Sequence, residues 1–168
     1  MRTSSTTNDK AANNMPEAID AIELLTEDHE TVKAMFEKFE ALSDRSMASK
    51  KKLATEICLE LTKHALAEEE IFYPAFLKAN KKEDDLIDEA VVEHASAKDL
   101  IAQIMEMDAS EDLFDAKVKV LGEMIEHHVE EEEEEMFPKA RESGLDLKML
   151  GQQIAARKSQ ITVADISA

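Results

Sequence analysis

The chain has 168 residues and a formal net charge of −18 at pH 7. This length suits one domain with a sizeable core and is too short for two ordinary domains. The negative charge argues against nucleic acids and anionic membrane surfaces as partners, because both repel an acidic protein. The single cysteine, Cys58, rules out an intramolecular disulfide and a Cys-x-x-Cys metal motif. A cation is the more natural partner.

Residues 1–14 are small and polar and show no periodicity, so the sequence predicts a disordered tail. This start lacks the apolar stretch of a signal peptide. No later segment approaches the run of about 18 apolar residues that a membrane span needs. We therefore expect a soluble, cytoplasmic protein.

Four long amphipathic helices are predicted from apolar residues that recur every three or four positions. The first follows Pro16 and reaches Leu42. The others cover about residues 48–73, 84–108 and 111–137, and the second and fourth are expected to end near Pro74 and Pro138, because proline lacks a backbone donor. With short links, these helices predict an all-α, up-down antiparallel four-helix bundle.

A shorter fifth helix is predicted after Gly144 and is expected to cap the bundle. The bundle domain is assigned to residues 15–161. Residues 162–168 are expected to fray, as chain ends commonly do.

Each long helix carries one histidine within its apolar stripe: His29, His64, His94 and His128. One such histidine is more often a satisfied core residue than a ligand. Four near the centres of their helices can meet at one depth of an antiparallel bundle. Without a metal, clustered neutral imidazoles would lack partners at a cost on the order of 1–3 kcal/mol each, so we favour metal ligation.

Two segments repeat one pattern, HALAEEEIFYP at 64–74 and HVEEEEEEMFP at 128–138. In each, a glutamate follows the histidine by four positions, which puts both side chains on one helical face. Relative to His128, an ideal helix turns Glu132 and Glu135 inward, and only the first has a glutamate counterpart in the other copy, Glu68. We therefore assign Glu68 and Glu132 as ligands. The side chains assigned to the surface are Glu69, Glu70, Glu130, Glu133 and Glu134, with His127 on the flank.

Imidazole and carboxylate donors without thiolate suit iron, manganese or zinc. Four histidines and two glutamates exceed the needs of one ordinary zinc site, so they favour two metals. If both carboxylates bridge, each metal receives two histidines, two carboxylate oxygens and a shared oxo or hydroxo group.

The order of these residues, with Pro74 and Pro138 after the two His-x-x-x-Glu pairs, resembles the hemerythrin-like (HHE cation-binding) domain family over roughly residues 17–160. The resemblance implies a non-haem di-iron centre in a four-helix bundle, with oxygen binding, peroxide or nitric oxide chemistry, or iron sensing. By position, it implies one iron on His29 and His64, the other on His94 and His128. Glu68 and Glu132 would bridge the two irons.

The chain departs from the oxygen carriers of this family, which resemble it but have a second histidine four residues after the first in the third helix. Lys98 occupies that position here. The vacant coordination position is then left to water or to Tyr73. An ideal helix points Tyr73 away from His64, but Pro74 disrupts the turn. Simple packing of Tyr73 at the end of the bundle is the alternative, as for its counterpart Phe137.

The leading functional hypothesis is a cytoplasmic di-iron protein that reacts with O2, H2O2 or NO, in a catalase-like or stress-protective role. The second is a sensor or binding module without turnover, in which metal or gas binding alters contacts with a partner protein. A metal-free acidic bundle is the third.

Overall fold

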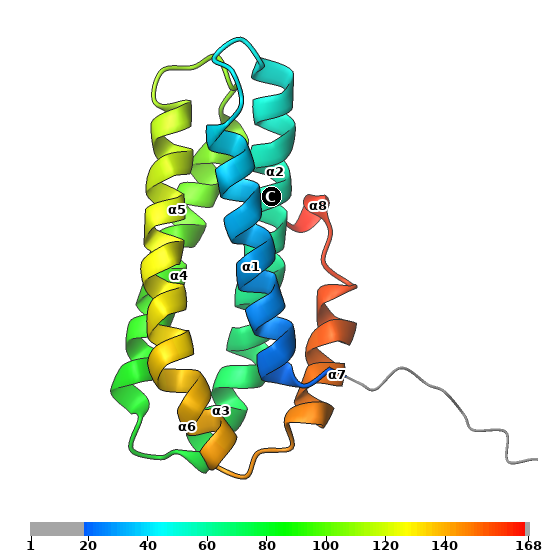
Figure 1. Cartoon of the computed structure of the whole chain (residues 1–168), viewed down its shortest axis with the longest axis vertical. Helices are drawn as coiled ribbons and strands as arrows, with labels where there is room; N and C mark the ends of the chain where they lie inside the picture. Colours follow the sequence, from blue (N-terminus) through cyan, green and yellow to red (C-terminus); the bar gives the residue numbers. More distant parts are fainter. Residues whose placement is uncertain (1–18, 167–168) are drawn as a thin grey trace, which may run out of the picture.

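The computed structural model describes residues 19–166, so the predicted tail at residues 1–14 lies outside the described part. Four long helices run antiparallel to one another in an up-down bundle, which confirms the predicted all-α fold (Figure 1). They are α1 (Ala21–Glu40), α2 (Met47–Ala67), α4 (Asp84–Glu106) and α5 (Phe114–Glu131). None of the helices within residues 19–166 has the combined length and hydrophobicity to cross a lipid bilayer.

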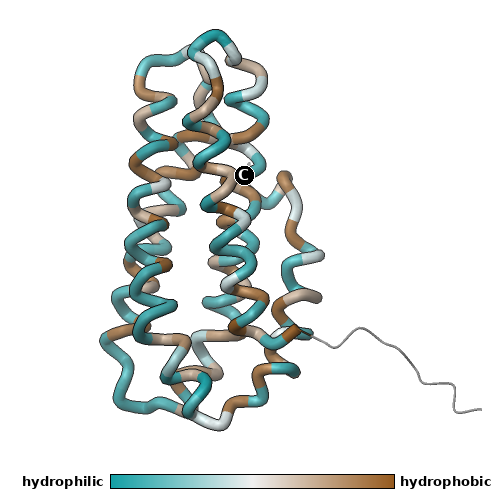
Figure 2. The backbone as a smooth tube through the Cα atoms, viewed as in Figure 1, coloured by the Kyte–Doolittle hydropathy of each residue, from teal (hydrophilic) through white to brown (hydrophobic). Residues whose placement is uncertain are grey.

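Apolar side chains form two core clusters at different heights in the bundle. One contains Leu25 and Phe76, and the other contains Val32 and Leu61. Along each helix, hydrophobic segments alternate with hydrophilic ones and are found toward both ends of the bundle (Figure 2). His29 lies between Leu25 and Val32 in the sequence, so the histidine layer falls between the two clusters.

The second and fourth helices do not end at their prolines, contrary to the prediction. A π-helical turn, η1 (Glu68–Phe72), connects α2 to α3 (Tyr73–Ala79). In the same way η2 (Glu132–Met136) connects α5 to α6 (Phe137–Glu142). Each proline sits in the first turn of the helix that follows, where a missing backbone donor costs little.

The two π turns change which side chains face the core. A π turn contains one more residue than an α turn, so the residues after it are rotated relative to an unbroken helix. The expectation that Glu135 points inward is therefore wrong: Glu135 is exposed, whereas Met136 and Phe137 are buried. In the first copy Phe72 and Tyr73 are buried in the matching places.

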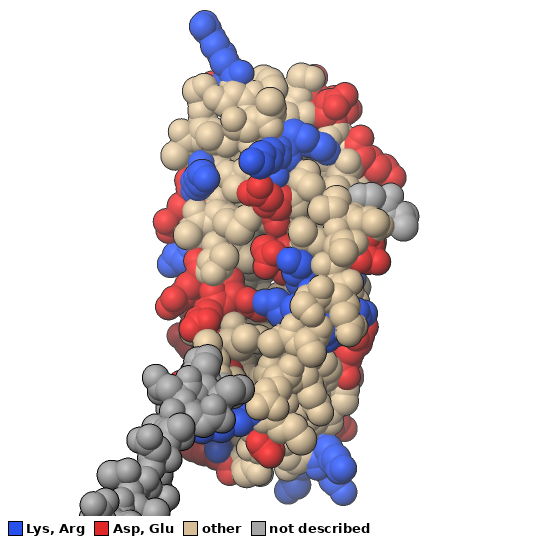
Figure 3. Space-filling view, turned by 90° about the vertical axis from the view of Figure 1, so that its right-hand side faces the viewer, with Lys and Arg blue, Asp and Glu red and all other residues tan. Residues whose placement is uncertain are grey.

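The predicted fifth helix is α7 (Leu147–Lys158), but it lies along α1 and α2 instead of capping the bundle (Figure 1). Its apolar face is buried through Leu150 and Ile154, which belong to the core cluster that contains Leu25. Gly151 permits the close approach, because a Cβ atom there would lie 2.5 Å from the carbonyl oxygen of Ile19. The view in Figure 3 looks onto this side of the molecule.

The end of the described chain forms a short helix, α8 (Val163–Ile166), where fraying was expected. The Asp165 carboxylate accepts a hydrogen bond from the backbone N–H of Thr162 at 2.7 Å, which stabilises the first turn. Ile166 packs against the core cluster that contains Val32.

Candidate metal centre

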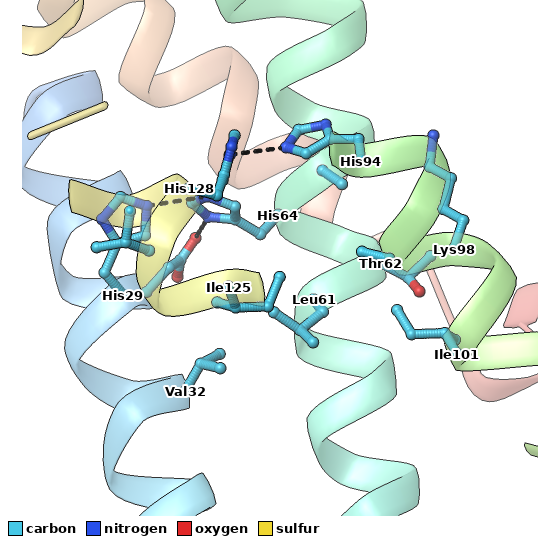
Figure 4. Close-up of a pocket in the computed structure, with 14 residues that line it drawn as sticks. His29, Val32, Leu61, Thr62, His64, His94, Lys98, Ile101, Ile125 and His128 are labelled. Carbon is cyan, nitrogen blue, oxygen red and sulfur yellow. Dashed lines mark hydrogen bonds and ion pairs between the residues drawn. The ribbon is translucent and has the colours of Figure 1, made fainter. Parts of the chain in front are cut away.

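Six buried side chains meet at one level of the bundle. The four histidines come one each from α1, α2, α4 and α5, and their rings turn toward a common centre (Figure 4). The two carboxylates are Glu68 and Glu132, which are 0% and 1% exposed. All six residues singled out by the repeated pattern are therefore brought together.

The histidines form two pairs, each joined across two neighbouring helices. His29 Nε2 lies 3.2 Å from His64 Nε2, and His94 Nε2 lies 3.0 Å from His128 Nε2. In both pairs the Nε2 atoms point into the centre of the bundle (Figure 4). We call the His29 and His64 side subsite A and the His94 and His128 side subsite B.

Each of the two buried glutamates reaches both subsites. Glu68 places Oε1 3.0 Å from His64 Nε2 and Oε2 3.3 Å from His94 Nε2. Glu132 places Oε2 3.2 Å from His29 Nε2 and Oε1 3.3 Å from His128 Nε2. The geometry follows from the spacing of four residues between each histidine, near the end of α2 or α5, and the glutamate that begins η1 or η2, which aims both donors at the same side of the helix.

A second layer of carboxylates holds the outer nitrogens of the histidines. Each imidazole Nδ1 contacts one carboxylate, and the pairs are His29 with Glu133 at 2.8 Å, His64 with Asp28 at 3.0 Å, His94 with Glu69 at 2.8 Å and His128 with Glu93 at 2.6 Å. An ionised carboxylate only accepts hydrogen bonds, so each Nδ1 carries a proton. Whenever such a ring is neutral, its Nε2 atom presents a lone pair to the centre.

The sequence pattern places Glu69 and Glu133 on the surface and does not predict this second layer. Their side chains are 23% and 39% exposed, yet each uses one oxygen to accept from a histidine. A signal was present in the sequence, since Asp28 and Glu93 directly precede histidines, and Glu69 and Glu133 directly follow the two buried glutamates. Each contacts a histidine of another helix, which a pattern within one helix does not reveal.

The centre as it stands has more electron pairs than hydrogens to share. The paired Nε2 atoms face one another, and the nearest groups to Glu68 Oε1 and Glu132 Oε2 are imidazole Nε2 atoms, which can donate to them only when protonated. Such an arrangement needs positive charge, supplied by protons or by metal ions. Nitrogen and oxygen donors converge in groups whose atoms lie within 4.8 Å of one another, so the residues fit a metal.

In the metal-free protein, protons take that role. Burial lowers the pKa of His64, but the Glu68 and Asp28 carboxylates outweigh burial and raise it to about 10. The pKa of His128 is raised to about 9, because Glu132 outweighs burial in the same way. Burial disfavours ionised Glu132, yet His128 and His29 hold its pKa well below the usual range.

Tyr73 lies inside subsite B. Its hydroxyl donates to Glu132 Oε1 at 2.7 Å and lies 3.3 Å from His94 Nε2, and its ring stacks on His94. The η1 turn, which the sequence did not reveal, brings it there. Phe137 takes the matching place in subsite A, where its ring stacks on His29 at a centroid distance of 5.7 Å.

Two further sequence positions have other roles. Lys98, at the place of the extra histidine in oxygen carriers, contacts both oxygens of Glu69 at 2.7 and 2.8 Å and so supports the carboxylate behind His94. The side chain of His127 is 62% exposed and lies on the flank of α5, near Glu131.

A narrow cavity adjoins the four histidines on the side away from Tyr73. Its volume is about 30 Å³, with room for one or two molecules the size of water. Besides the histidines, its walls include Val32, Leu61, Ile101 and Ile125, so a small molecule there meets an almost entirely apolar surface beside the imidazole rings (Figure 4).

Comparison with known proteins agrees with the helical fold and with a cation-binding domain. The model of the hemerythrin HHE cation-binding domain matches residues 20–140. The crystal structure of a hemerythrin HHE cation-binding domain-containing protein from Mycobacterium kansasii is similar, with a TM-score of 0.71 and 29% sequence identity over 84% of this chain and 86% of that chain. No protein of curated function matches significantly. The chain belongs to the hemerythrin HHE cation-binding domain family.

Proposed function

We propose that the protein is a non-haem di-iron protein of the cytoplasm that reacts with O2, H2O2 or NO. One observation carries the proposal: both oxygens of Glu68, and both of Glu132, are divided between the two histidine pairs. A single metal would not need carboxylates that reach two separate pairs of imidazoles. Two metals would.

The donor set favours iron. Imidazole, carboxylate and phenol are present without thiolate, a combination that suits iron and other hard or borderline metals. A bound pair of irons, bridged by an oxo or hydroxo group, would supply redox chemistry and Lewis acidity to a small oxygen or nitrogen species. The chain's own residues hold the metals through Nε2 and carboxylate oxygens, while the outer carboxylates fix the ring orientation.

Tyr73 is proposed as a further ligand, in subsite B. Its hydroxyl lies within 3.3 Å of three other donors of that subsite: Glu132 Oε1, Glu68 Oε2 and His94 Nε2. In the metal-free protein, burial and the two carboxylates raise the pKa of Tyr73 well above its usual value. A cation in subsite B would reverse this effect, because it favours phenolate.

The cavity beside the histidines limits the reactant to a few atoms, which suits O2, NO and H2O2. Phenolate and carboxylate donors stabilise ferric iron, which favours peroxide turnover over reversible oxygen carriage. The most concrete activity is therefore catalase-like, the conversion of two H2O2 into two H2O and one O2. Such turnover would protect the cell against oxidative stress.

The second candidate is an iron, oxygen or nitric oxide sensor without turnover that acts through a partner protein. One observation favours it. The carboxylate of Asp28, which holds His64, also contacts Lys158 of α7, so the metal centre is connected to a helix on the surface of the bundle.

Metal analysis, an optical spectrum and an oxygen electrode test these candidates together. Freshly purified protein should contain two irons per chain, show charge-transfer bands and release O2 when H2O2 is added. Two irons without O2 release would favour the sensor. Zinc, or no metal, would contradict the di-iron proposal.

A further inference from the structure

A lysine of α7 supports the metal centre through an outer carboxylate. The ammonium group of Lys158 contacts Asp28 Oδ1, and Asp28 Oδ2 accepts from His64 Nδ1 at 3.0 Å. The side chains of Lys158 and Asp28 are only 15% and 18% exposed, so water competes weakly for their charges. A chain of three side chains thus connects α7 to an imidazole of subsite A.

The docking of α7 determines where Lys158 lies. Leu150 and Ile154 are buried against the bundle, and on the same helix the guanidinium of Arg157 makes two contacts with Glu70, at 2.6 and 3.0 Å. At mid-height of this face, lysine and arginine atoms lie beside aspartate and glutamate atoms (Figure 3). α7 begins after residue 140, the last residue matched by the family model.

Subsite B contains a similar arrangement that does not involve α7. Lys98 of α4 contacts Glu69, and Glu69 accepts from His94 Nδ1 at 2.8 Å. Each subsite therefore has one imidazole whose outer carboxylate is held by a lysine. Subsite B obtains its lysine from within the four-helix bundle, whereas subsite A obtains it from the C-terminal helix α7.

We propose that α7 supports the metal centre by placing Lys158 against Asp28. Lys158 is thus a positioning residue for Asp28 and His64. This inference rests on the proposed di-iron function. The lysine fixes the orientation of the carboxylate and draws negative charge away from it, which orients His64 and tunes its strength as a ligand. Loss of the Lys158 contact would therefore act first on subsite A, through Asp28 and His64.

The test compares three variants of the full-length, iron-loaded protein. Lys158→Met removes the charge but keeps the aliphatic stem, Lys158→Arg keeps the charge, and Arg157→Ala removes the neighbouring contact of α7 with Glu70. Iron per chain is measured after dialysis against graded chelator, together with the ferric absorption spectrum. Circular dichroism checks that each variant keeps its helices.

Lys158→Met should lose one of its two irons at roughly 10-fold to 100-fold lower chelator strength than the wild type, with an altered spectrum. Lys158→Arg should restore much of the retention, and Arg157→Ala should behave as the wild type. If Arg157→Ala lost iron as readily as Lys158→Met, general docking of α7 would explain the effect and the role of Lys158 would be refuted.

Two further results separate this inference from the proposed function. A wild-type chain with two irons whose Lys158→Met variant has unchanged retention and spectrum would refute the inference alone. A wild-type chain that binds no iron would refute the di-iron function, and this inference with it. Should Lys158→Met fail to fold, Lys158→Gln, which keeps a polar side chain, replaces it. The same loss of one iron and the same altered spectrum are then expected.

Discussion

Subsites A and B are built from two copies of one sequence pattern, yet they differ in a single donor. Both have two imidazoles, one oxygen from each of two shared glutamates and an aromatic ring stacked on a histidine. In subsite B that ring belongs to Tyr73 and carries a hydroxyl, whereas in subsite A it belongs to Phe137. The repeat therefore supplies a symmetric frame, and one oxygen atom makes the two proposed metal positions chemically different.

The largest effect should follow from removing what the subsites share. Because each buried glutamate faces both histidine pairs, Glu68→Ala or Glu132→Ala is expected to lose both irons together. Metal analysis of the purified variants checks this expectation. Retention of two irons by Glu132→Ala would show that the carboxylate does not hold the metals.

The control for this experiment is Glu134→Ala, since Glu134 is exposed on η2 and is not among the contacts of the centre. Glu133, although expected on the surface from the helical pattern, is unsuitable as a control because it accepts from His29 Nδ1. Glu133→Ala should instead weaken iron binding in subsite A by roughly 10-fold to 100-fold.

Removal of both metals should destabilise the bundle. Metal binding at a structural site contributes on the order of 10 kcal/mol of folding free energy, and chelation would remove the cations from the buried Glu68 and Glu132 carboxylates. We expect the midpoint of thermal unfolding to fall by about 10 °C or more on chelation. Equal midpoints with and without iron would mean that the site and folding are not coupled.

The metal-free protein should also lose stability at high pH, where protons no longer replace the metals. The folded-state pKa values of His64 and His128, about 10 and about 9, lie above the ordinary value of 6.5. The contribution of these two protonated histidines to the free energy of unfolding is complete below pH 6.5. It disappears as the pH rises through 9 to 10. Urea unfolding of chelated protein should give a free energy lower by about 2 kcal/mol or more at pH 10 than at pH 7.

The iron-loaded protein provides the control for this pH series. Its histidines bind metal through Nε2 and have no proton to lose there, so its stability should depend much less on pH across the same range. A chelated protein that became more stable between pH 7 and pH 10 would contradict the charged histidine and carboxylate pairs.

The smallest effect on metal content is expected at Tyr73, whose hydroxyl is the donor that distinguishes subsite B from subsite A. Tyr73→Phe makes subsite B resemble subsite A, so both irons should remain while the visible ferric phenolate band disappears.

The reciprocal change, Phe137→Tyr, would bring a hydroxyl to subsite A. It should add a second such band, at a packing cost of about 1–3 kcal/mol. If Tyr73→Phe left the spectrum unchanged, water would occupy the remaining coordination position of subsite B.

Much of this centre could be predicted from the sequence, because it depends on spacing within single helices. The apolar stripes indicated four helices, and the spacing of His64 to Glu68 and of His128 to Glu132 placed each pair on one face. Antiparallel packing then brings the midpoints of the helices together. The six proposed ligands were therefore accessible from the sequence, and their roles as ligands stay a prediction.

Only the tertiary structure decided the features that depend on contacts between helices or on irregular turns. The π turns rotate Tyr73 into subsite B and Glu135 out to solvent, which the α-helical period cannot reveal. The carboxylates behind the histidines, and the approach of Lys158 from α7, join residues far apart in the sequence. The bundle and its inner donors could be predicted because both follow from helical periodicity. The asymmetry and the outer support of the centre come from packing between elements, which a pattern along one helix does not record.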